Sequence, residues 1–331
     1  MIHQYIDRRS SKAVTENIFH DRLINSIYSD VREKSPFAFS LLISSRMSSL
    51  IAFAVYDIPF GGLFTGAESF VKKLGIGLNE CYEPQNLKTP RQIFERKIKY
   101  WKCRPMNADP KSIVSPADSR MLAGNLSKNR NLFVKEKFFS YEELIGVHKE
   151  QWLMKFTNGS YAVFRLTPDK YHWNHFPVSG VIADFYEFDG SCHSCNPSAV
   201  VSEITPYSKN RRAVTIIDTD VEGGTNCGFV AMFEVAALMI GGIEQRYSSR
   251  FYDDPQALQR GMFVEKGAPK SIYHPGSSVD ILLFEKDRMN FSEDINFNLK
   301  RKDASSRYSE GFGESLVETE VELRSEIGRS L

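Results

Sequence analysis

The residues with the most specific chemical potential are Gly276, Ser277 and Ser278, which directly precede the largely apolar run 279–284. Such runs are typical of buried strands, so the tripeptide lies at the start of an expected strand. A strained Gly-Ser bond in that place can cut itself: the serine hydroxyl attacks the glycine carbonyl, and the amide becomes an ester. Elimination and hydrolysis then leave a pyruvoyl group on the new N-terminus. Glycine suits the position before the break because it tolerates backbone angles that other residues resist. Alone, the tripeptide is more typical of a plain turn.

Two upstream segments carry further reactive side chains. Residues 114–120 read Val-Ser-Pro-Ala-Asp-Ser-Arg, and residues 168–180 read Pro-Asp-Lys-Tyr-His-Trp-Asn-His-Phe-Pro-Val-Ser-Gly. Together with Gly-Ser-Ser they resemble the ordered motifs of the phosphatidylserine decarboxylases. These motifs are a Ser-Pro-Ala-Asp-Gly element, a Tyr-His-x-x-His-x-Pro-x-x-Gly element and a Gly-Ser-Thr or Gly-Ser-Ser cleavage site. The resemblance extends from about Pro90 to the chain end.

The resemblance implies a proenzyme that cuts itself between Gly276 and Ser277 and carries a covalent pyruvoyl group derived from Ser277. By the same resemblance, Asp118 is the orienting carboxylate, His175 the base and Ser277 the nucleophile, as in other sites where a carboxylate-held histidine activates a hydroxyl. His172 is implied near the substrate carboxylate or as the proton donor after carbon dioxide leaves. No metal is implied.

The implied reaction is the decarboxylation of phosphatidylserine to phosphatidylethanolamine. Removal of carbon dioxide leaves an electron pair that no side chain can accept, so enzymes of this kind borrow or make a carbonyl group. The pyruvoyl group from Ser277 would form a Schiff base with the substrate amine and take up that pair. The two cleavage fragments are expected to stay associated, and a homo-oligomer is left open.

Three departures from the family pattern leave the substrate open. Ser119 stands where the family has glycine, Arg211 replaces its usual glutamate, and Ser271 lies in a stretch without the family's acidic pair and Gly-x-Phe. The same chemistry on a free aromatic amino acid therefore remains an alternative, as does a catalytically dead relative that acts as a binding protein. A serine hydrolase that uses the same three residues without self-cleavage is disfavoured, because the sequence has no Gly-x-Ser-x-Gly elbow.

Composition agrees with a cytoplasmic globular protein. The 331 residues include 42 Lys plus Arg and 41 Asp plus Glu, so global charge gives no reason to expect a nucleic-acid partner. The N-terminus lacks the apolar core of a signal peptide, and the five cysteines are expected to be reduced thiols. Cys192 and Cys195 have a spacing that could grip a metal, but no second pair follows at a suitable distance, so a metal site is disfavoured.

Residues 1–84 are expected to form a helical N-terminal region, and residues 85–331 the decarboxylase domain. Apolar residues between Val14 and Val31 recur at helical spacing. The apolar stretch Phe37 to Phe64 is too interrupted to span a bilayer. It fits either an interfacial helical hairpin, which would attach the protein peripherally to a membrane, or a helical layer packed on the protein's own core. Thr89 to Arg104 is expected to be a basic helix that could rest on anionic lipid.

After Pro110 the sequence turns to segments rich in branched and aromatic residues, which are typical of strands. No helical crossovers separate them, so the expected fold class is α+β: a mainly antiparallel β body with a helical N-terminal layer. The expected strands are 161–166, 178–188, 213–218, 229–235 and 279–284.

Overall fold

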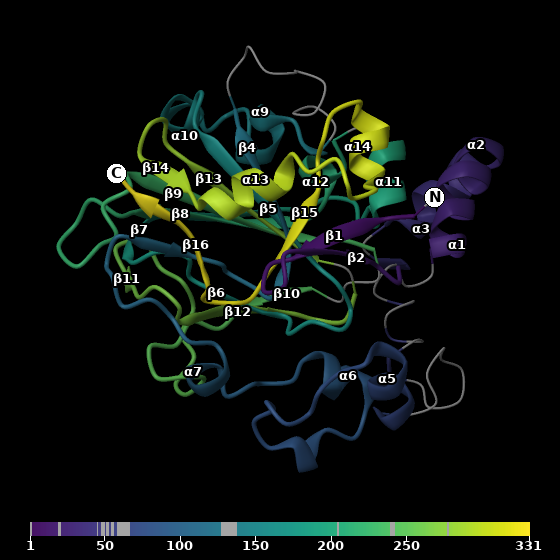
Figure 1. Cartoon of the computed structure of the whole chain (residues 1–331), viewed down its shortest axis with the longest axis horizontal. Helices are drawn as coiled ribbons and strands as arrows, with labels where there is room; N and C mark the ends of the chain where they lie inside the picture. The colour runs from purple at the N-terminus through teal and green to yellow at the C-terminus, as the bar shows by residue number, and fades with distance from the viewer. Residues whose placement is uncertain are drawn as a thin grey trace.

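A computed structural model describes residues 2–18, 21–44, 67–126, 138–203, 205–238, 242–276 and 278–331, with residues 46, 47, 50, 53, 56 and 57. Its main element is a ten-stranded sheet (Figure 1). Across the sheet the strands are β11 (Phe263–Val264), β7 (Gly180–Phe188), β8 (Arg212–Asp218), β9 (Phe229–Ala236), β13 (Ser278–Phe284), β5 (Ser160–Leu166), β4 (Ser119–Asn125), β15 (Glu318–Val321), β1 (Gln4–Asp7) and β2 (Lys12–Thr15).

This sheet confirms the expected antiparallel β body. Each neighbouring pair of its strands is antiparallel except β1 with β15, which is parallel. The five strands expected from the sequence all form, as β5, β7, β8, β9 and β13. They were predictable because their side chains are apolar on both faces, as expected for strands that are covered on both sides.

One face of the sheet is covered by helices. These are α9 (Tyr141–Ile145), α10 (Glu150–Phe156), α11 (Pro197–Ser202), α12 (Pro206–Lys209) and α14 (Arg307–Phe312). From β13, Val279, Ile281 and Leu283 point into the core between the sheet and these helices. Successive residues of a strand point to opposite faces, so Leu282 and Phe284 enter a second core on the other side.

Two small antiparallel sheets help to cover the other face. One has the order β10 (Ile243–Gln245), β12 (Pro269–Tyr273) and β6 (Trp173–His175), and the other β14 (Met289–Phe291), β16 (Glu326–Ser330) and β3 (Ser112–Val114). Helix α13 (Glu293–Leu299) adds Ile295 to the same core. The second of the upstream motifs thus lies in a layer packed against the sheet that contains β13.

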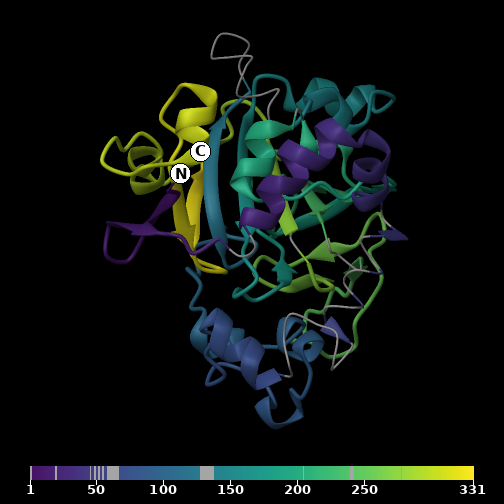
Figure 2. The same ribbon diagram turned by 90° about the vertical axis from the view of Figure 1, so that its right-hand side faces the viewer.

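The N-terminal region forms short helices in two groups (Figure 2). The first group is α1 (Asp21–Ser26), the π-helical turn η1 (Ile27–Val31), α2 (Arg32–Lys34) and α3 (Pro36–Leu42), and it packs against α11. The second is α5 (Ala67–Leu74), the 3₁₀ turn η2 (Pro84–Asn86), α6 (Pro90–Phe94) and α7 (Tyr100–Cys103). In both views α5 and α6 lie at the lower end of the molecule, away from the helices of the opposite face.

Two expectations for this region are wrong. Val14 lies in strand β2, not in a helix, because residues 4–7 and 12–15 form a hairpin that extends the large sheet beside β15. The expected helix from Thr89 to Arg104 is two short helices. Thr89 starts α6 with a capping box, but Ile98 then forms a β-bridge with Cys81, which interrupts the helix.

Half of the apolar stretch Phe37 to Phe64 lies outside the described residues. Helix α3 covers its beginning, with Phe39 buried and with Phe37 and Leu41 exposed. Among the described helices, none has both the length and the apolar content that crossing a bilayer requires.

Candidate functional site

The strand that begins at the expected cleavage step lies in the middle of the large sheet. Ser278, the first residue of β13, is opposite Ala236 of β9 on one side and Leu166 of β5 on the other. Gly276 has a φ of +147°, in the region that favours glycine. Ser277 lies outside the described residues. The backbone before the strand therefore has a conformation that other residues resist, and the strand that follows is held along both edges.

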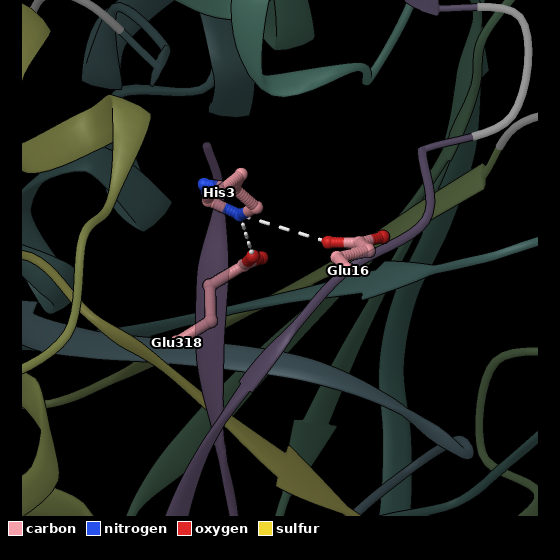
Figure 3. Close-up of side chains that lie close together, drawn as sticks. All are labelled: His3, Glu16 and Glu318. Carbon is pink, nitrogen blue, oxygen red and sulfur yellow. Dashed lines mark hydrogen bonds and ion pairs between the residues drawn. The ribbon is translucent and has the colours of Figure 1, made fainter. Parts of the chain in front are cut away.

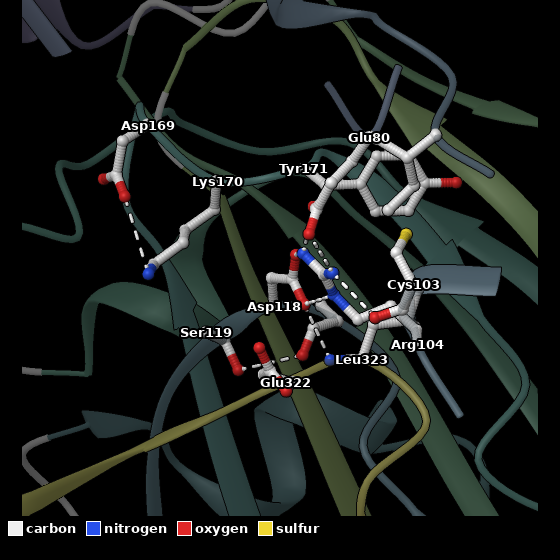
Figure 4. A network of polar contacts seen from close by, with 12 residues as sticks. Glu80, Cys103, Arg104, Asp118, Ser119, Asp169, Lys170, Tyr171, Glu322 and Leu323 are labelled. Atoms are coloured by element: carbon white, nitrogen blue, oxygen red, sulfur yellow. Dashed lines mark hydrogen bonds and ion pairs between the residues drawn. The ribbon is translucent and has the colours of Figure 1, made fainter. Parts of the chain in front are cut away.

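Asp118, in the loop between β3 and β4, is a buried carboxylate with a fixed cation (Figure 4). Its Oδ1 and Oδ2 accept hydrogen bonds of 2.9 Å from Nε and Nη2 of Arg104. Oδ1 also accepts the backbone N–H of Leu323 at 2.8 Å. Burial alone would raise the pKa of Asp118, but the hydrogen bonds and charge of Arg104 outweigh it and hold the pKa below its usual value. Asp118 is therefore ionised at neutral pH.

His175, at the end of β6, is fully buried and neutral. Burial lowers its pKa to about 3. Nδ1 lies 2.8 Å from the Gly267 carbonyl, which can only accept, so the ring proton is assigned to Nδ1. The lone pair of Nε2 then faces the hydroxyl of Tyr171 at 3.1 Å. An unprotonated nitrogen of this kind can accept a proton, as a base must.

His172 lies in a different environment, three residues earlier. Its Nδ1 donates to the Lys170 carbonyl at 2.9 Å, and its ring stacks on Phe94 with centroids 3.7 Å apart. Burial, reinforced by the charge of Arg96, lowers its pKa to about 3. Nε2 is buried and has no hydrogen-bond partner in the part of the chain that the structure describes. An unprotonated ring nitrogen of this kind can accept a hydrogen bond.

The backbone brings the two upstream motifs side by side. The N–H of His175 donates to the Pro116 carbonyl at 2.8 Å, and the N–H of Val114 donates to the Pro177 carbonyl at 3.0 Å. The side chains of Asp118 and His175, however, hydrogen-bond to other groups, and no direct bond joins them among the described contacts. The motifs meet as expected, while the implied carboxylate–histidine contact is replaced by Arg104 on one side and Gly267 on the other.

Two cavities lie beside Gly276 and Asp118, and the segment 167–171 contributes to both, whereas neither His172 nor His175 is among their described lining residues. The Gly276 cavity has a volume of about 280 Å³ and is lined by Gly276, Leu166 and Arg120 among others. The Asp118 cavity has a volume of about 800 Å³, and Asp118, Arg104 and Tyr171 lie in its wall. Residues of the sequence motifs therefore line two cavities, and cavities of these volumes can hold small-molecule groups.

The stretch that departs from the family takes part in a buried polar network. Nζ of Lys270 lies 2.5 Å from Oε2 of Glu234, and both side chains are fully buried. The hydroxyl of Ser271 donates to the other carboxylate oxygen of Glu234. Asp280 lies opposite Glu234 across β9 and β13, and burial, with the charge of Glu234, raises its pKa well above the usual value. Burial therefore favours the protonated form of Asp280, three residues after Ser277.

Sequence reasoning missed Arg104, Glu234 and Lys270 as members of the site. An arginine gives no local sign of which acid it will bind, and Arg104 is 14 positions from Asp118. A lysine at position 270, within a strand buried at all of its residues, was the one available signal for the polar network.

One group of described side chains has the spacing of metal ligands: His3, Glu16 and Glu318 (Figure 3). Nε2 of His3 lies 2.8 Å from Glu318 and 3.7 Å from Glu16. Nη2 of Arg165, however, lies 2.6 Å from Oε2 of both carboxylates and already supplies the positive charge between them. The group is better explained as an ion-pair cluster. Cys192 and Cys195 are buried and not joined by a disulfide.

The chain is similar to phosphatidylserine decarboxylases over most of its length. A family model described as phosphatidylserine decarboxylase matches residues 91–313, which contain Asp118, His172, His175 and Ser277. A phosphatidylserine decarboxylase proenzyme from Fusobacterium nucleatum is 27% identical over 319 residues, covering 94% of this chain and 97% of that protein. One from Ruminiclostridium cellulolyticum is 27% identical over 294 residues, covering 88% and 90%. A phosphatidylserine decarboxylase proenzyme 2 from Oryza sativa is 32% identical over 233 residues, covering 68% of this chain and 34% of that protein.

Replacing Arg104 by glutamine is expected to leave Asp118 buried without its cation and to lower the free energy of unfolding by about 3–5 kcal/mol at pH 7. In the native protein the pKa of Asp118 lies below its unfolded value, so its stabilising effect is present at neutral pH and is lost as the pH falls through the folded value. In the variant, burial raises that pKa above the unfolded value, so the destabilisation shrinks as the pH falls. Urea unfolding between pH 7.5 and 4.5 should show the difference between the two proteins narrowing.

Arg91→Gln is the matched control, because Arg91 pairs with Asp57 at a partly exposed site far from Asp118 in the sequence. It should cost less stability. A difference between native and Arg104→Gln protein that stays constant over this pH range would contradict the assignment of Arg104 as the group that keeps Asp118 ionised.

Proposed function

The chain belongs to the phosphatidylserine decarboxylase family, and from this premise we propose that it is a self-cleaving proenzyme that converts phosphatidylserine to phosphatidylethanolamine. The observation that carries the proposal is the position of Gly276. It combines a positive φ with a place directly before the central strand β13, in the wall of a cavity. The hydroxyl of Ser277 attacks the Gly276 carbonyl carbon, and the peptide nitrogen leaves as an amine, giving an ester. Loss of the Cα proton of Ser277 then expels the Gly276 carboxylate.

The remaining dehydroalanine tautomerises to an imine, and water converts it to a ketone with release of ammonia. The pyruvoyl carbonyl made in this way supplies the electron sink for decarboxylation. Two observations support the fit of this group: the glycine geometry at position 276, and the Ser278 hydroxyl, which is buried without a hydrogen-bond partner among the described residues. A buried hydroxyl without a partner can donate a hydrogen bond to the carbonyl oxygen of a pyruvoyl group formed next to it.

His175 is the proposed base for self-cleavage. It is neutral because burial lowers its pKa to about 3, and Gly267 fixes the tautomer that leaves Nε2 unprotonated. The Tyr171 hydroxyl is hydrogen-bonded to Nε2 of His175. It must therefore move away from this nitrogen, or relay the proton of Ser277 to it, for His175 to act as the base. Asp118 supplies a nearby negative charge that favours protonation of His175. His172 is proposed to serve the substrate, since its Nε2 has no partner within the described structure.

A lipid substrate is favoured over a free amino acid by the walls of the Gly276 cavity. Ile24 of α1, Leu74 of α5 and Tyr56 lie in its lining and belong to the N-terminal helical region. Apolar side chains next to the reacting bond suit a substrate that carries acyl chains, which offer far more apolar surface than the side chain of a free amino acid. Decarboxylation of a free amino acid is the second candidate, and the departure at Ser271 is the observation that favours it.

The expected result for self-cleavage is a mature protein of two pieces, residues 1–276 and 277–331. Ser277→Ala should abolish cleavage because the attacking hydroxyl is lost, whereas Ser278→Ala should retain some. Intact-mass analysis checks both, with the uncut chain at 37.8 kDa. Full processing of Ser277→Ala, or only uncut native protein, would refute self-cleavage at this bond.

Substitution of the two histidines should affect different stages: His175 the self-cleavage, and His172 the decarboxylation. His175→Ala, like Asp118→Asn, is expected to slow self-cleavage by at least tenfold because Ser277 loses its base. His172→Ala should cleave normally but release carbon dioxide poorly. The rates of fragment appearance and of carbon dioxide release from phosphatidylserine vesicles are measured on the same preparations. Normal turnover by His172→Ala would rule out its proposed role, and normal cleavage by both other variants would rule out theirs.

We further propose that the N-terminal helices attach the protein peripherally to a membrane. Phe37 and Leu41 are 82% and 47% exposed and are one turn apart on α3, whose other side buries Phe39. An apolar face of this kind can enter the headgroup region of a bilayer. The acyl chains of a lipid substrate could then stay in the bilayer while its headgroup enters the protein.

Phe37→Asp combined with Leu41→Asp should weaken sedimentation with anionic vesicles several-fold. Phe297→Asp on α13, which removes an equally apolar and 70% exposed ring, is the control and should change little. Binding of the native protein to anionic vesicles should weaken as the salt concentration rises, because salt screens the charges. The binding that remains at high salt reports the apolar contribution. If the cleaved protein does not bind vesicles and decarboxylates a free amino acid, the proposed lipid substrate is wrong, whereas the proposed self-cleavage still holds.

A further inference from the structure

The Gly276 cavity is enclosed by parts of the chain that are far apart in sequence. Arg120 and Arg165 contribute from β4 and β5, and Thr167 follows β5. Tyr5 and Glu16 contribute from the N-terminal hairpin and the residue after it. Three cationic side chains and two carboxylates occur among the described lining residues, so the wall has more positive than negative groups. Because Glu318 and Glu320 also pair with the two arginines, the hydrogen-bonding capacity left on each arginine decides whether the cavity can bind an anion.

The two arginines lie directly opposite each other across β4 and β5, but they differ in how their charge is balanced. Arg165 uses Nε, Nη1 and Nη2 to bind Glu16 and Glu318, so its fork is fully engaged with two carboxylates. Little of its hydrogen-bonding capacity is left for a ligand.

Arg120 is balanced only in part. It is 5% exposed, and its guanidinium carbon lies 3.4 Å from the centre of the Tyr5 ring. Its Nη1 binds Glu320, but the same carboxylate oxygen also accepts a hydrogen bond from Lys170. Its Nε is buried and has no hydrogen-bond partner among the residues that the structure describes. An unsatisfied buried donor is costly, so a ligand that accepts from it gains affinity.

We propose that Arg120 binds an anionic group of the substrate headgroup inside the Gly276 cavity. This inference rests on the proposed function, because the anion is taken to belong to the molecule whose amine meets the cleaved step. A guanidinium recognises carboxylates and phosphodiesters equally well through its planar fork. The serine headgroup of a phospholipid offers both groups, and a free amino acid offers the carboxylate alone. The Tyr5 ring holds the guanidinium in place from its flat side.

The test uses the full chain with Ser277→Ala, which is expected to stay uncut because it lacks the attacking hydroxyl. Isothermal titration with sn-glycero-3-phospho-L-serine is expected to show binding, and adding Arg120→Gln should weaken it roughly tenfold or more. L-Serine, which lacks the phosphodiester, and sn-glycero-3-phosphoethanolamine, which lacks the carboxylate, are titrated in parallel. If Arg120→Gln weakens the binding of L-serine, Arg120 binds the carboxylate. If it weakens the binding of sn-glycero-3-phosphoethanolamine, Arg120 binds the phosphodiester.

Arg288→Gln is the matched control, because Arg288 pairs with Asp220 at an exposed site and does not line the cavity. Arg120→Lys keeps the charge without the fork and should bind with intermediate affinity, which guards against a glutamine variant that fails to fold. Unchanged affinity in folded Arg120→Gln, or no binding of any of the three ligands to the parent protein, would overturn the inference. Self-cleavage of the native chain is measured separately by mass, so a failure of the proposed function is seen independently.

Discussion

The rest of the structure depends on the position of β13, which is hydrogen-bonded to β9 and β5 in the middle of the large sheet. A break before this strand cuts the chain without freeing the C-terminal piece. That piece would contain β13, β15 and β16. Strand β13 pairs with β5 and β9, β15 pairs with β4 and β1, and β16 pairs with β3. All five partners belong to the other piece. Under the proposed cleavage, both pieces would therefore share one core, and the strand would stay fixed while the residue before it changes chemically.

Buried ion pairs set the second constraint. Arg104 with Asp118, Arg165 with Glu16 and Glu318, and Lys270 with Glu234 each join segments that are distant in sequence. Separating one partner of such a pair leaves an uncompensated buried charge and costs several kcal/mol. The pair of Arg165 with Glu16 attaches the segment after β2 to β5, so the N-terminal hairpin becomes part of the cavity wall. Residues outside the matched family region thus help to shape the candidate site.

The sequence was sufficient for the long apolar strands, because runs of apolar residues are local signals, whereas the roles of Asp118, His172 and His175 stay predictions. It failed where the deciding partner is remote. Strand β1 is short and polar at its ends, and its neighbour β15 lies more than 300 residues away. Val14 fits a helical period by chance, and only pairing with Tyr5 makes it a strand residue. The hold of Arg104 on Asp118 likewise depends on the folded chain.

The fold prepares an anion and a neutral base in one buried region by two different means. Burial keeps His175 unprotonated, whereas Arg104 keeps Asp118 ionised in spite of burial. Because Arg104 already balances Asp118, a proton accepted by His175 would meet less negative charge than in an isolated carboxylate–histidine pair. Glu80 also pairs with Arg104, so this arginine joins two carboxylates that both lie in the wall of the Asp118 cavity. Burial therefore sets the low pKa of the candidate base, and the charge of Asp118, which Arg104 and Glu80 join in one chain of ion pairs, opposes it only as a smaller contribution.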